Sequence, residues 1–357
     1  MSKKQTLVVI GNGMVGHHFL VSLMASDIKN QYQVVTFCEE SRAAYDRLHL
    51  TDYFTGKTAD DLSMVEDGFF ETNGITIHIG DKATEVNLQY KTVSSEKGLS
   101  ISYDKLVMAT GSYAFVPLIS GHDREQCLVY RTIDDLDEIK AAAEKSKVGA
   151  VIGGGLLGLE AAKVLHDLDI KTNVIQFSPR LMSAQLDDGG AKLLTDKIEE
   201  LGVSVLTSKN TIEITEGEQC KNKMIFADGE ELETDIVIFS AGIRPRDEIA
   251  RSCGLKVGSR GGIVIDNQCR TSDPDVFAIG ECAVWKEQIF GLVAPGYTMA
   301  RTVVNVLAGK DASFTGADMS TKLKLNGVDV ASIGDAHANT PESVTYTYQN
   351  GAQGVYK

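Results

Sequence analysis

The chain has 357 residues, 43% of them hydrophobic and 24% charged, with a formal net charge of −14 at pH 7. This length predicts two or more domains, and the charge argues against nucleic acids and anionic membranes as partners. Six scattered cysteines with no C-x-x-C pair argue against a redox dithiol, a zinc site and the usual iron–sulfur ligand spacing. With no membrane-length apolar stretch either, we expect a cytoplasmic protein without a metal site.

The sequence predicts alternating strands and helices. Residues 6–10 (TLVVI) are an uninterrupted apolar run, typical of a parallel strand buried on both faces. Thr132 predicts the start of a helix over 133–145. Residues 295–309 predict a helix with Pro at its start and Gly at its end. The other expected elements are a helix through Val15 and Leu23, strands over 33–37, 172–177, 235–242 and 275–281, strands that end in a glycine turn over 103–112 and 149–154, a helix through Val164 and Leu165, and β structure from Thr315 onward.

One strand–glycine turn–helix unit occurs twice. Each copy reads G-x-G-x-x-G, with Gly11, Gly13 and Gly16 in the first and Gly153, Gly155 and Gly158 in the second. The first glycine allows a tight turn, the second lets backbone N–H groups approach a pyrophosphate, and the third lets helix pack on strand. Two copies predict two dinucleotide sites, one for FAD and one for NADH or NADPH as substrate. The alternative is one such site and one purely structural turn.

An acidic residue about 20 positions after the glycines normally binds a ribose diol. Glu39 meets this expectation in the first unit, with Glu40 as its competitor. The second unit has Gln176 instead, which does not repel a 2′-phosphate. Arg180 either pairs with such a phosphate or is a solvated surface charge. The choice between NADH and NADPH therefore stays open.

Two strand ends complete the predicted flavin site. In a domain that the second unit interrupts, Thr110 and Gly111 would meet Gly280 and Glu281 beside the first glycine turn. Glu281 would then lie at the ribityl or pyrophosphate end of FAD, the alternative being an ordinary exposed carboxylate. The helix from Pro295 would direct its N-terminus at the flavin carbonyl and stabilise the reduced ring.

These segments resemble the glutathione-reductase-like two-dinucleotide flavoproteins of the rubredoxin-reductase type. The closer resemblance is to the N-terminal flavin module of the large subunit of assimilatory NAD(P)H nitrite reductases. The segments that carry it span nearly the whole chain: FCEESRAAYDRLHLTDYF, YDKLVMATGS, YRTIDDL, VIGGGLLGLEAA, FSAGIRPRD, TSDPDVFAIGECAVW, FGLVAPGYTMA and KLKLNGVDVASIGDAH.

The resemblance implies an α/β fold with two Rossmann-like dinucleotide-binding domains, the second inserted in the first. We expect a first FAD-binding part over 1–118, an NAD(P)H-binding domain over 119–243 and a second FAD-binding part over 244–312. A truncated α+β interface domain is expected over 313–357.

The resemblance also implies roles that spacing does not give. Arg42 and Arg47 match positions near FAD, with Arg47 close to the isoalloxazine, although sequence alone favours a solvated face for both. Glu160 matches a carboxylate near the nicotinamide and the flavin edge. Gly242 matches a glycine lining the nicotinamide nucleotide site. Glu160 and Arg47 are therefore the expected catalytic residues, and Gln176 departs from the Glu that the family pattern predicts.

The expected activity is hydride transfer from NAD(P)H to FAD. In nitrite reductases the electrons would continue to iron–sulfur and sirohaem domains, whose cysteine clusters this chain lacks. We therefore do not expect it to reduce nitrite alone. The alternatives are a free-standing reductase of rubredoxin or a small ferredoxin, and a non-enzymatic flavin-bound sensing domain. The sequence leaves the oligomeric state open, with a homodimer as one arrangement.

Overall fold

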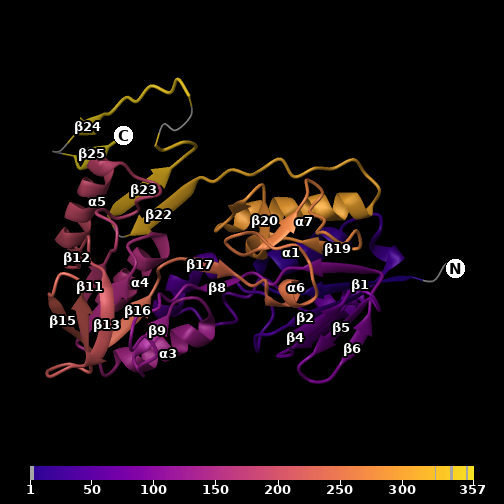
Figure 1. Cartoon of the computed structure of the whole chain (residues 1–357), viewed down its shortest axis with the longest axis horizontal. Coiled ribbons are helices and arrows are strands. Elements are labelled where there is room, and N and C mark those ends of the chain that lie inside the picture. The colour runs from indigo at the N-terminus through magenta and orange to yellow at the C-terminus, as the bar shows by residue number, and fades with distance from the viewer. Residues whose placement is uncertain (1–3, 326, 338–340, 351–352) are drawn as a thin grey trace. The chain divides into compact units, whose positions relative to one another are not determined.

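A computed structural model describes residues 4–325, 327–337, 341–350 and 353–357 (Figure 1). The chain forms two compact units. The first comprises Met1–His49, Lys57–Tyr113 and Ile243–Met319, and the second comprises Leu50–Gly56, Ala114–Gly242 and Ser320–Lys357. The chain therefore enters the second unit three times, and its longest stretch there is Ala114–Gly242. The four-part division expected at residues 118, 243 and 312 stays a prediction.

A parallel five-stranded sheet organises the first unit. Its order is β19-β7-β1-β2-β3, so β1 lies between β2 and β7. Apolar strand residues such as Leu7, Val8 and Phe277 are buried in its core, and helices α1 and α7 pack together. The strands are β1 (Gln5–Ile10), β2 (Tyr32–Cys38), β3 (Thr76–Ile79), β7 (Lys105–Met108) and β19 (Val276–Ala278), and the two helices are α1 (Met14–Met24) and α7 (Val293–Leu307).

Smaller elements surround that sheet. Two three-stranded sheets have the orders β4-β5-β6 and β18-β20-β21, and β8 pairs with β17. The strands are β4 (Ala83–Asn87), β5 (Thr92–Ser95), β6 (Ser100–Ser102), β8 (Ser112–Ala114), β17 (Ile243–Pro245), β18 (Ile263–Ile265), β20 (Ala283–Trp285) and β21 (Gln288–Ile289). The short helices of this unit are η1 (Lys29–Gln31), α2 (Phe69–Asn73), α6 (Glu248–Ser252) and η3 (Gly280–Cys282). A further helix, η2 (Arg47–Phe54), begins in the first unit, and its residues from Leu50 onward belong to the second.

The second unit repeats the same plan. Its parallel sheet has the order β12-β11-β10-β16-β9, so β10 lies between β11 and β16. A three-stranded antiparallel sheet, β13-β14-β15, adds to it. The elements are β9 (Cys127–Val129), α3 (Ile133–Ala143), β10 (Val148–Ile152), α4 (Leu156–Asp167), β11 (Lys171–Ile175), α5 (Asp188–Glu200), β12 (Ser204–Leu206), β13 (Thr211–Glu216), β14 (Asn222–Phe226), β15 (Glu231–Thr234) and β16 (Ile236–Phe239).

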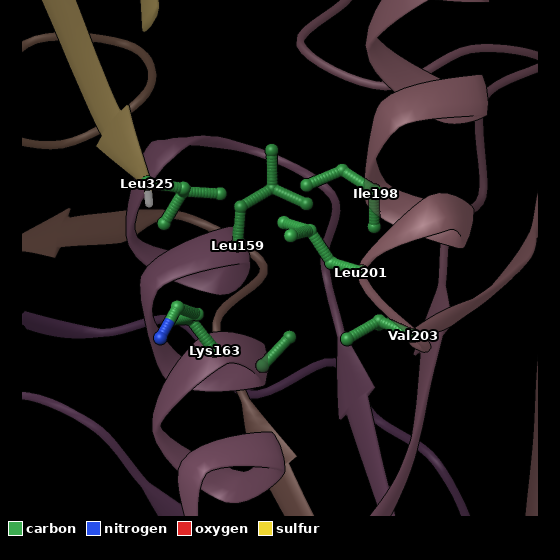
Figure 2. A pocket seen from close by; sticks show the side chains of 7 residues that line it. Leu159, Lys163, Ile198, Leu201, Val203 and Leu325 are labelled. Carbon is green, nitrogen blue, oxygen red and sulfur yellow. The ribbon is translucent and has the colours of Figure 1, made fainter. Parts of the chain in front are cut away.

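The last residues of the chain pack within the second unit. Their described residues form two antiparallel strand pairs, β22 (Thr321–Leu325) with β23 (Val328–Ser332) and β24 (Gln349–Asn350) with β25 (Val355–Tyr356). Figure 2 shows Leu325 of β22 near Leu159 of α4, opposite Ile198 of α5, around a small hollow lined mainly by apolar side chains. The buried Leu325 thus extends the apolar packing between these two helices.

Most predicted elements are confirmed. Thr132 caps α3 in a capping box, with its side chain accepting from the Asp135 N–H and the Asp135 carboxylate accepting in return. The predicted strands over 235–242 and 275–281 are each too long, because Gly242 and Gly280 have φ values of +113° and +80°, which extended strands do not adopt. The turn predicted at the end of 103–112 is confirmed, since β7 ends at Met108 and Gly111 has a φ of +68°.

The boundaries predicted for α7 are also wrong. This helix begins at Val293, two residues before Pro295. A proline is tolerated in the first turn because N–H groups there have no intrahelical partner. The helix ends at Leu307, and Gly309 takes the left-handed φ of +70° that commonly follows a helix. Of the helices in the described ranges, none has both the length and the apolar character needed to cross a bilayer.

Candidate functional site

The first glycine of each repeat is required by a neighbouring carbonyl. Gly11 and Gly153 have φ values of +108° and +122°. A Cβ on Gly11 would lie 2.2 Å from the Ala109 carbonyl oxygen, and one on Gly153 would lie 2.1 Å from that of Ser240. Ala109 follows β7 and Ser240 follows β16, so both turns meet the same strand end of their own sheet. Neither position accommodates a side chain.

The third glycine packs each helix onto its turn. A Cβ on Gly16 would lie 2.1 Å from the Gly11 carbonyl oxygen, and one on Gly158 would lie 1.8 Å from that of Gly153. Any larger residue would therefore push α1 or α4 away from its turn. These clashes agree with the role that spacing predicts for the third glycine.

The second glycine of each repeat faces open space. A Cβ on Gly13 or Gly155 would meet no atom of the described residues within 4 Å. Both residues are N-caps without a side-chain cap, so no capping side chain occupies the first N–H groups of α1 and α4. Free N–H groups and the partial positive charge of a helix N-terminus favour a phosphate. The geometry fits one pyrophosphate at each helix.

Each glycine turn also occupies the expected edge of its sheet. β1 and β10 are followed in sequence by helices that lead to β2 and β11, while β7 and β16 lie on the other side. This reversal of strand order opens a crevice at the carboxyl ends of the strands, which is where open α/β sheets bind ligands. Both turns lie at such a point.

Glu39 and Glu40, the two candidate ribose ligands, have different partners. Glu39 accepts from Lys82 Nζ at 3.1 Å and is ion-paired with Arg246. Glu40 accepts from the Tyr45 hydroxyl at 2.6 Å and is ion-paired with Arg47. The Glu39 carboxylate is thus held between two cations at the end of β2. Sequence reasoning did not single out Arg246, because its pairing with Glu39 spans 207 residues of sequence.

Arg47 is brought together with Glu281 in the first unit. The Arg47 guanidinium lies 4.9 Å from the centre of the Tyr45 ring. Burial disfavours its charge, but Tyr45, Glu40 and Glu281 outweigh burial and raise the pKa of Arg47. Arg47 is therefore a fixed cation with acidic groups around it.

The other predicted flavin residues lie at neighbouring strand ends. Thr110 Oγ1 donates to the Arg246 carbonyl oxygen at 2.7 Å, and the Arg246 N–H donates to the Gly111 carbonyl oxygen at 2.9 Å. A Cβ on Gly280 would lie 3.3 Å from Val15. Gly296, in the first turn of α7, approaches the same valine, since its Cβ would lie 2.5 Å from Val15 Cγ2. The starts of α1 and α7 therefore meet at η3. Arg42 lies on the loop after β2.

In the second unit, Gln176 is engaged by the glycine turn itself. Its Oε1 accepts from the Gly154 N–H at 2.7 Å, and its Nε2 donates to Ser178 Oγ. Arg180 Nη1 lies 2.5 Å from Asp188 Oδ1, a carboxylate that is 91% exposed, and Arg180 Nε is buried without a hydrogen-bond partner among the residues that the structure describes. Gly242 faces open space, and Glu160 lies on α4.

The six cysteines are all free thiols within the described residues. Burial, followed by Glu40, raises the pKa of Cys38 to about 11, and burial also raises that of Cys282. These thiols are therefore protonated near neutral pH and poor nucleophiles. No group of three His, Cys, Asp or Glu side chains that suits a metal ion occurs in the part of the chain that the structure describes.

Residues 5–304 match the pyridine nucleotide-disulphide oxidoreductase family. The chain belongs to this family. Its α/β fold and parallel Rossmann-like sheets confirm the predicted fold class. The module is an FAD-dependent NAD(P)H oxidoreductase homologous to the nitrite reductase large subunit, as the resemblance implied.

The relatives include two nitrite reductases. The chain is 56% identical over 354 residues to the "Nitrite reductase [NAD(P)H] large subunit" of Klebsiella oxytoca, covering 99% of this chain and 37% of that protein. It is 53% identical over 355 residues to the "Nitrite reductase (NADH) large subunit" of Escherichia coli strain K12, covering 99% of this chain and 42% of that protein. The chain thus spans less than half the length of these relatives.

Solved structures show the same fold. An NAD-dependent persulfide reductase from A. fulgidus has a TM-score of 0.86 and 27% identity, over 92% of this chain and 64% of that one. The water-forming NADH oxidase of Lactobacillus brevis, bound to NADH, has a TM-score of 0.88 and 20% identity, over 99% of this chain and 82% of that one.

Proposed function

We propose that this chain is the electron-input module of a nitrite reductase large subunit. It takes a hydride from NAD(P)H and passes electrons to iron–sulfur and sirohaem centres held outside these residues. The observation that carries the proposal is the repeated glycine turn, with open space at Gly13 and Gly155 and a helix N-terminus beside each. The likeness to nitrite reductases, at 56% and 53% identity, supports the proposed direction of electron flow.

The residues of the first unit fit FAD. Gly11, Gly13 and Gly16 would receive its pyrophosphate, and Glu39 its adenosine ribose. Thr110, Gly111, Gly280 and Glu281 lie at the strand ends nearest this turn, and the Arg42 and Arg47 loop follows β2. FAD, when bound, supplies the ring that accepts the hydride. The cation of Arg47 and the N-terminus of α7 would stabilise negative charge there.

The residues of the second unit fit NAD(P)H. Gly153, Gly155 and Gly158 would hold the pyrophosphate, with Gly242 and Glu160 at the nicotinamide end. Gln176 is neutral and bonded to the glycine turn, so no charge there repels a 2′-phosphate. Arg180 is a cation suited to binding that phosphate, and among the described residues its buried Nε has no hydrogen-bond partner. We therefore propose that NADPH is accepted as well as NADH.

The test is anaerobic mixing of the FAD-loaded chain with NADH and NADPH in turn, followed at the flavin absorption band. Rapid bleaching by either nucleotide supports the proposal. A bound flavin that neither nucleotide bleaches would overturn it and favour the sensing domain. We expect no nitrite reduction by this chain alone.

A reductase of rubredoxin or a small ferredoxin is the second candidate. The observation that favours it is 27% identity to the "Rubredoxin-NAD(+) reductase" of Ectopseudomonas oleovorans, over 84% of this chain and 77% of that one. Steady NAD(P)H-dependent reduction of rubredoxin would support it. Failure with rubredoxin, combined with electron transfer to the remaining nitrite reductase domains, would support the first. The cytoplasmic location and a homodimer stay predictions.

A further inference from the structure

A short segment of the chain is held by a helix far away in sequence. Residues Leu50–Gly56 lie between two segments of the first unit but pack within the second. The Tyr53 hydroxyl lies 2.5 Å from Asp137 Oδ1, and Lys140 Nζ donates to the Tyr53 carbonyl oxygen at 2.8 Å. Lys140 Nζ also lies 3.6 Å from the centre of the Tyr53 ring. We name Tyr53, Asp137 and Lys140 the α3 clamp.

A kink in η2 allows the α3 clamp to determine the direction of this segment. The helix η2 is kinked at His49, where φ is −118° and ψ is 27°. His49 is also the last first-unit residue before Leu50. Because the helix does not run straight through this point, the direction of Asp52 depends on the contacts of its neighbour Tyr53.

A buried phenol, Tyr130, belongs to the same unit as Asp52. Tyr130 follows β9, and its hydroxyl has no hydrogen-bond partner among the described residues, although the residue is only 3% exposed. Burial raises the pKa of Tyr130, and the carboxylates of Glu160 and Asp52 raise it further. Tyr130 therefore stays protonated, as a donor, beside two negative charges.

Strand register places Tyr130 at the edge used by the second glycine turn. Val129 pairs with Phe239, and Phe239 pairs with Ile152. The residues that follow these three are Tyr130, Ser240 and Gly153, which thus end adjacent parallel strands. This carboxyl edge is where a nucleotide binds in such sheets.

The nicotinamide ring gains a positive charge when it is oxidised, and this change gives Asp52, Glu160 and Tyr130 a role. A dihydronicotinamide ring is neutral, and it becomes a positively charged pyridinium when hydride, one proton with two electrons, leaves C4 for FAD. Carboxylates held nearby stabilise the charge that develops in the transition state and remains in the product. A buried O–H without a protein acceptor is suited to the carboxamide oxygen of the same ring.

We propose that Asp52, positioned by the α3 clamp, joins Glu160 and Tyr130 in the nicotinamide site and favours the oxidised, positively charged ring. This inference rests on the proposed function, because it requires the nucleotide to bind in the second unit. Tyr53 and Lys140 are positioning residues that act through Asp52.

Binding, rather than turnover, tests the role of Asp52. Calorimetry on the FAD-loaded chain would compare NAD⁺ with 1,4,5,6-tetrahydro-NAD, whose ring is neutral and donates no hydride. In Asp52→Asn we expect the Kd of NAD⁺ to rise about three- to tenfold, because the variant loses a partly exposed charge pair. The Kd of the neutral analogue should stay nearly unchanged. Asp169→Asn is the matched control, because it removes a charge from the turn after α4 and should change neither Kd.

Three further variants separate the effect of charge from the effect of position. Tyr130→Phe should weaken both probes equally, since both carry the carboxamide. Lys140→Ala should lower the preference for NAD⁺ in the same direction as Asp52→Asn, and Lys140→Arg should restore it. A merely structural role of the clamp would lower the melting temperature of Lys140→Ala and leave the ratio of the two Kd values at the wild-type value.

The outcomes distinguish the two proposals. If NAD(P)H bleaches the wild-type flavin but Asp52→Asn keeps the wild-type ratio of Kd values, the role of Asp52 is wrong and the proposed function stands. If the wild-type chain binds neither probe and its flavin is not bleached, both proposals are wrong. A changed ratio in Asp52→Asn and in Lys140→Ala, with Lys140→Arg and Asp169→Asn unchanged, supports the inference.

Discussion

The hydroxyl of Ser112 donates a hydrogen bond of 2.7 Å to the carboxylate of Glu281, across 169 residues of sequence. Glu281 was predicted to lie at the ribityl or pyrophosphate end of FAD, whereas Ser112 was not singled out. The bond restricts the Glu281 carboxylate before FAD binds, so less side-chain conformational entropy is lost on binding. Ser112 is therefore a positioning residue for the proposed flavin site.

Ser112→Ala should weaken FAD binding by about three- to tenfold, less than the full value of a hydrogen bond to a charged group, because Ser112 acts on FAD only through Glu281. Fluorescence titration of the flavin-free chain with FAD measures this. Ser112→Thr keeps the donor and should bind close to the wild-type level. Ser100→Ala, on the short strand β6, is the control. Equal affinity of Ser112→Ala and wild type would show that the bond does not serve the flavin.

The second and third glycines of the first repeat should respond differently to alanine. Gly13→Ala meets open space, so the fold should persist while FAD affinity falls at least about tenfold, because the methyl group takes the place of the phosphate. Gly16→Ala clashes with the Gly11 carbonyl and should destabilise the fold by about 1–3 kcal/mol or more, as at an overpacked core position. Thermal melts and FAD titration of both variants provide the check. A Gly13→Ala protein that binds FAD normally contradicts the assigned phosphate site.

Gly155→Ala provides the same test in the second repeat. It should retain bound FAD and the wild-type melting temperature, since its Cβ also meets open space. Flavin bleaching by NAD(P)H should slow at least about tenfold at low nucleotide concentration. Loss of FAD from this variant would mean that the two sites are not separate.

Gln176→Glu should shift the nucleotide preference toward NADH. A glutamate still accepts from the Gly154 N–H, but its charge repels a 2′-phosphate. The ratio of the flavin bleaching rate with NADH to that with NADPH should therefore rise about tenfold or more. The bleaching rates with the two nucleotides measure that ratio. Arg180→Ala should selectively slow the reaction with NADPH. If Arg180→Ala leaves both rates unchanged, Arg180 is a solvated surface charge.

The fold should lose stability in mild acid through His17. This residue is buried against Phe69 and Phe70, and burial lowers its pKa from 6.5. The unfolded chain therefore binds a proton that the folded chain does not. The stability is complete above pH 6.5 and falls as the pH drops below that value.

Urea unfolding at pH 8 and pH 5 measures this effect. His17→Gln should show a smaller difference between the two values than the wild type. His122→Gln, in the loop before β9, is the control and should show the wild-type difference. An unchanged pH dependence in His17→Gln would rule out His17 as the source.

Local patterns predicted the backbone of the site but not its side-chain partners. The two glycine turns and the Thr132 cap depend on nearby residues, so spacing alone identified them. The partners Ser112 and Arg246 and the clamp residue Lys140 meet residues between 87 and 207 positions away. Such pairings depend on how the sheets assemble, and one sequence carries no local signal for them. Gln176 shows a middle case, because its position was expected but its bond to Gly154 was not.

The α3 clamp also limits how this protein can be recombined. A chimera that exchanges only residues 114–242 would take Asp137 and Lys140 and leave Tyr53 with the recipient chain. The exchanged α3 would face a Leu50–Gly56 segment from a different protein. The chimera would therefore lose the clamp contacts, although this segment lies outside the exchanged residues. A transferable nucleotide-binding cassette must therefore carry Leu50–Gly56 as a second, separate insert.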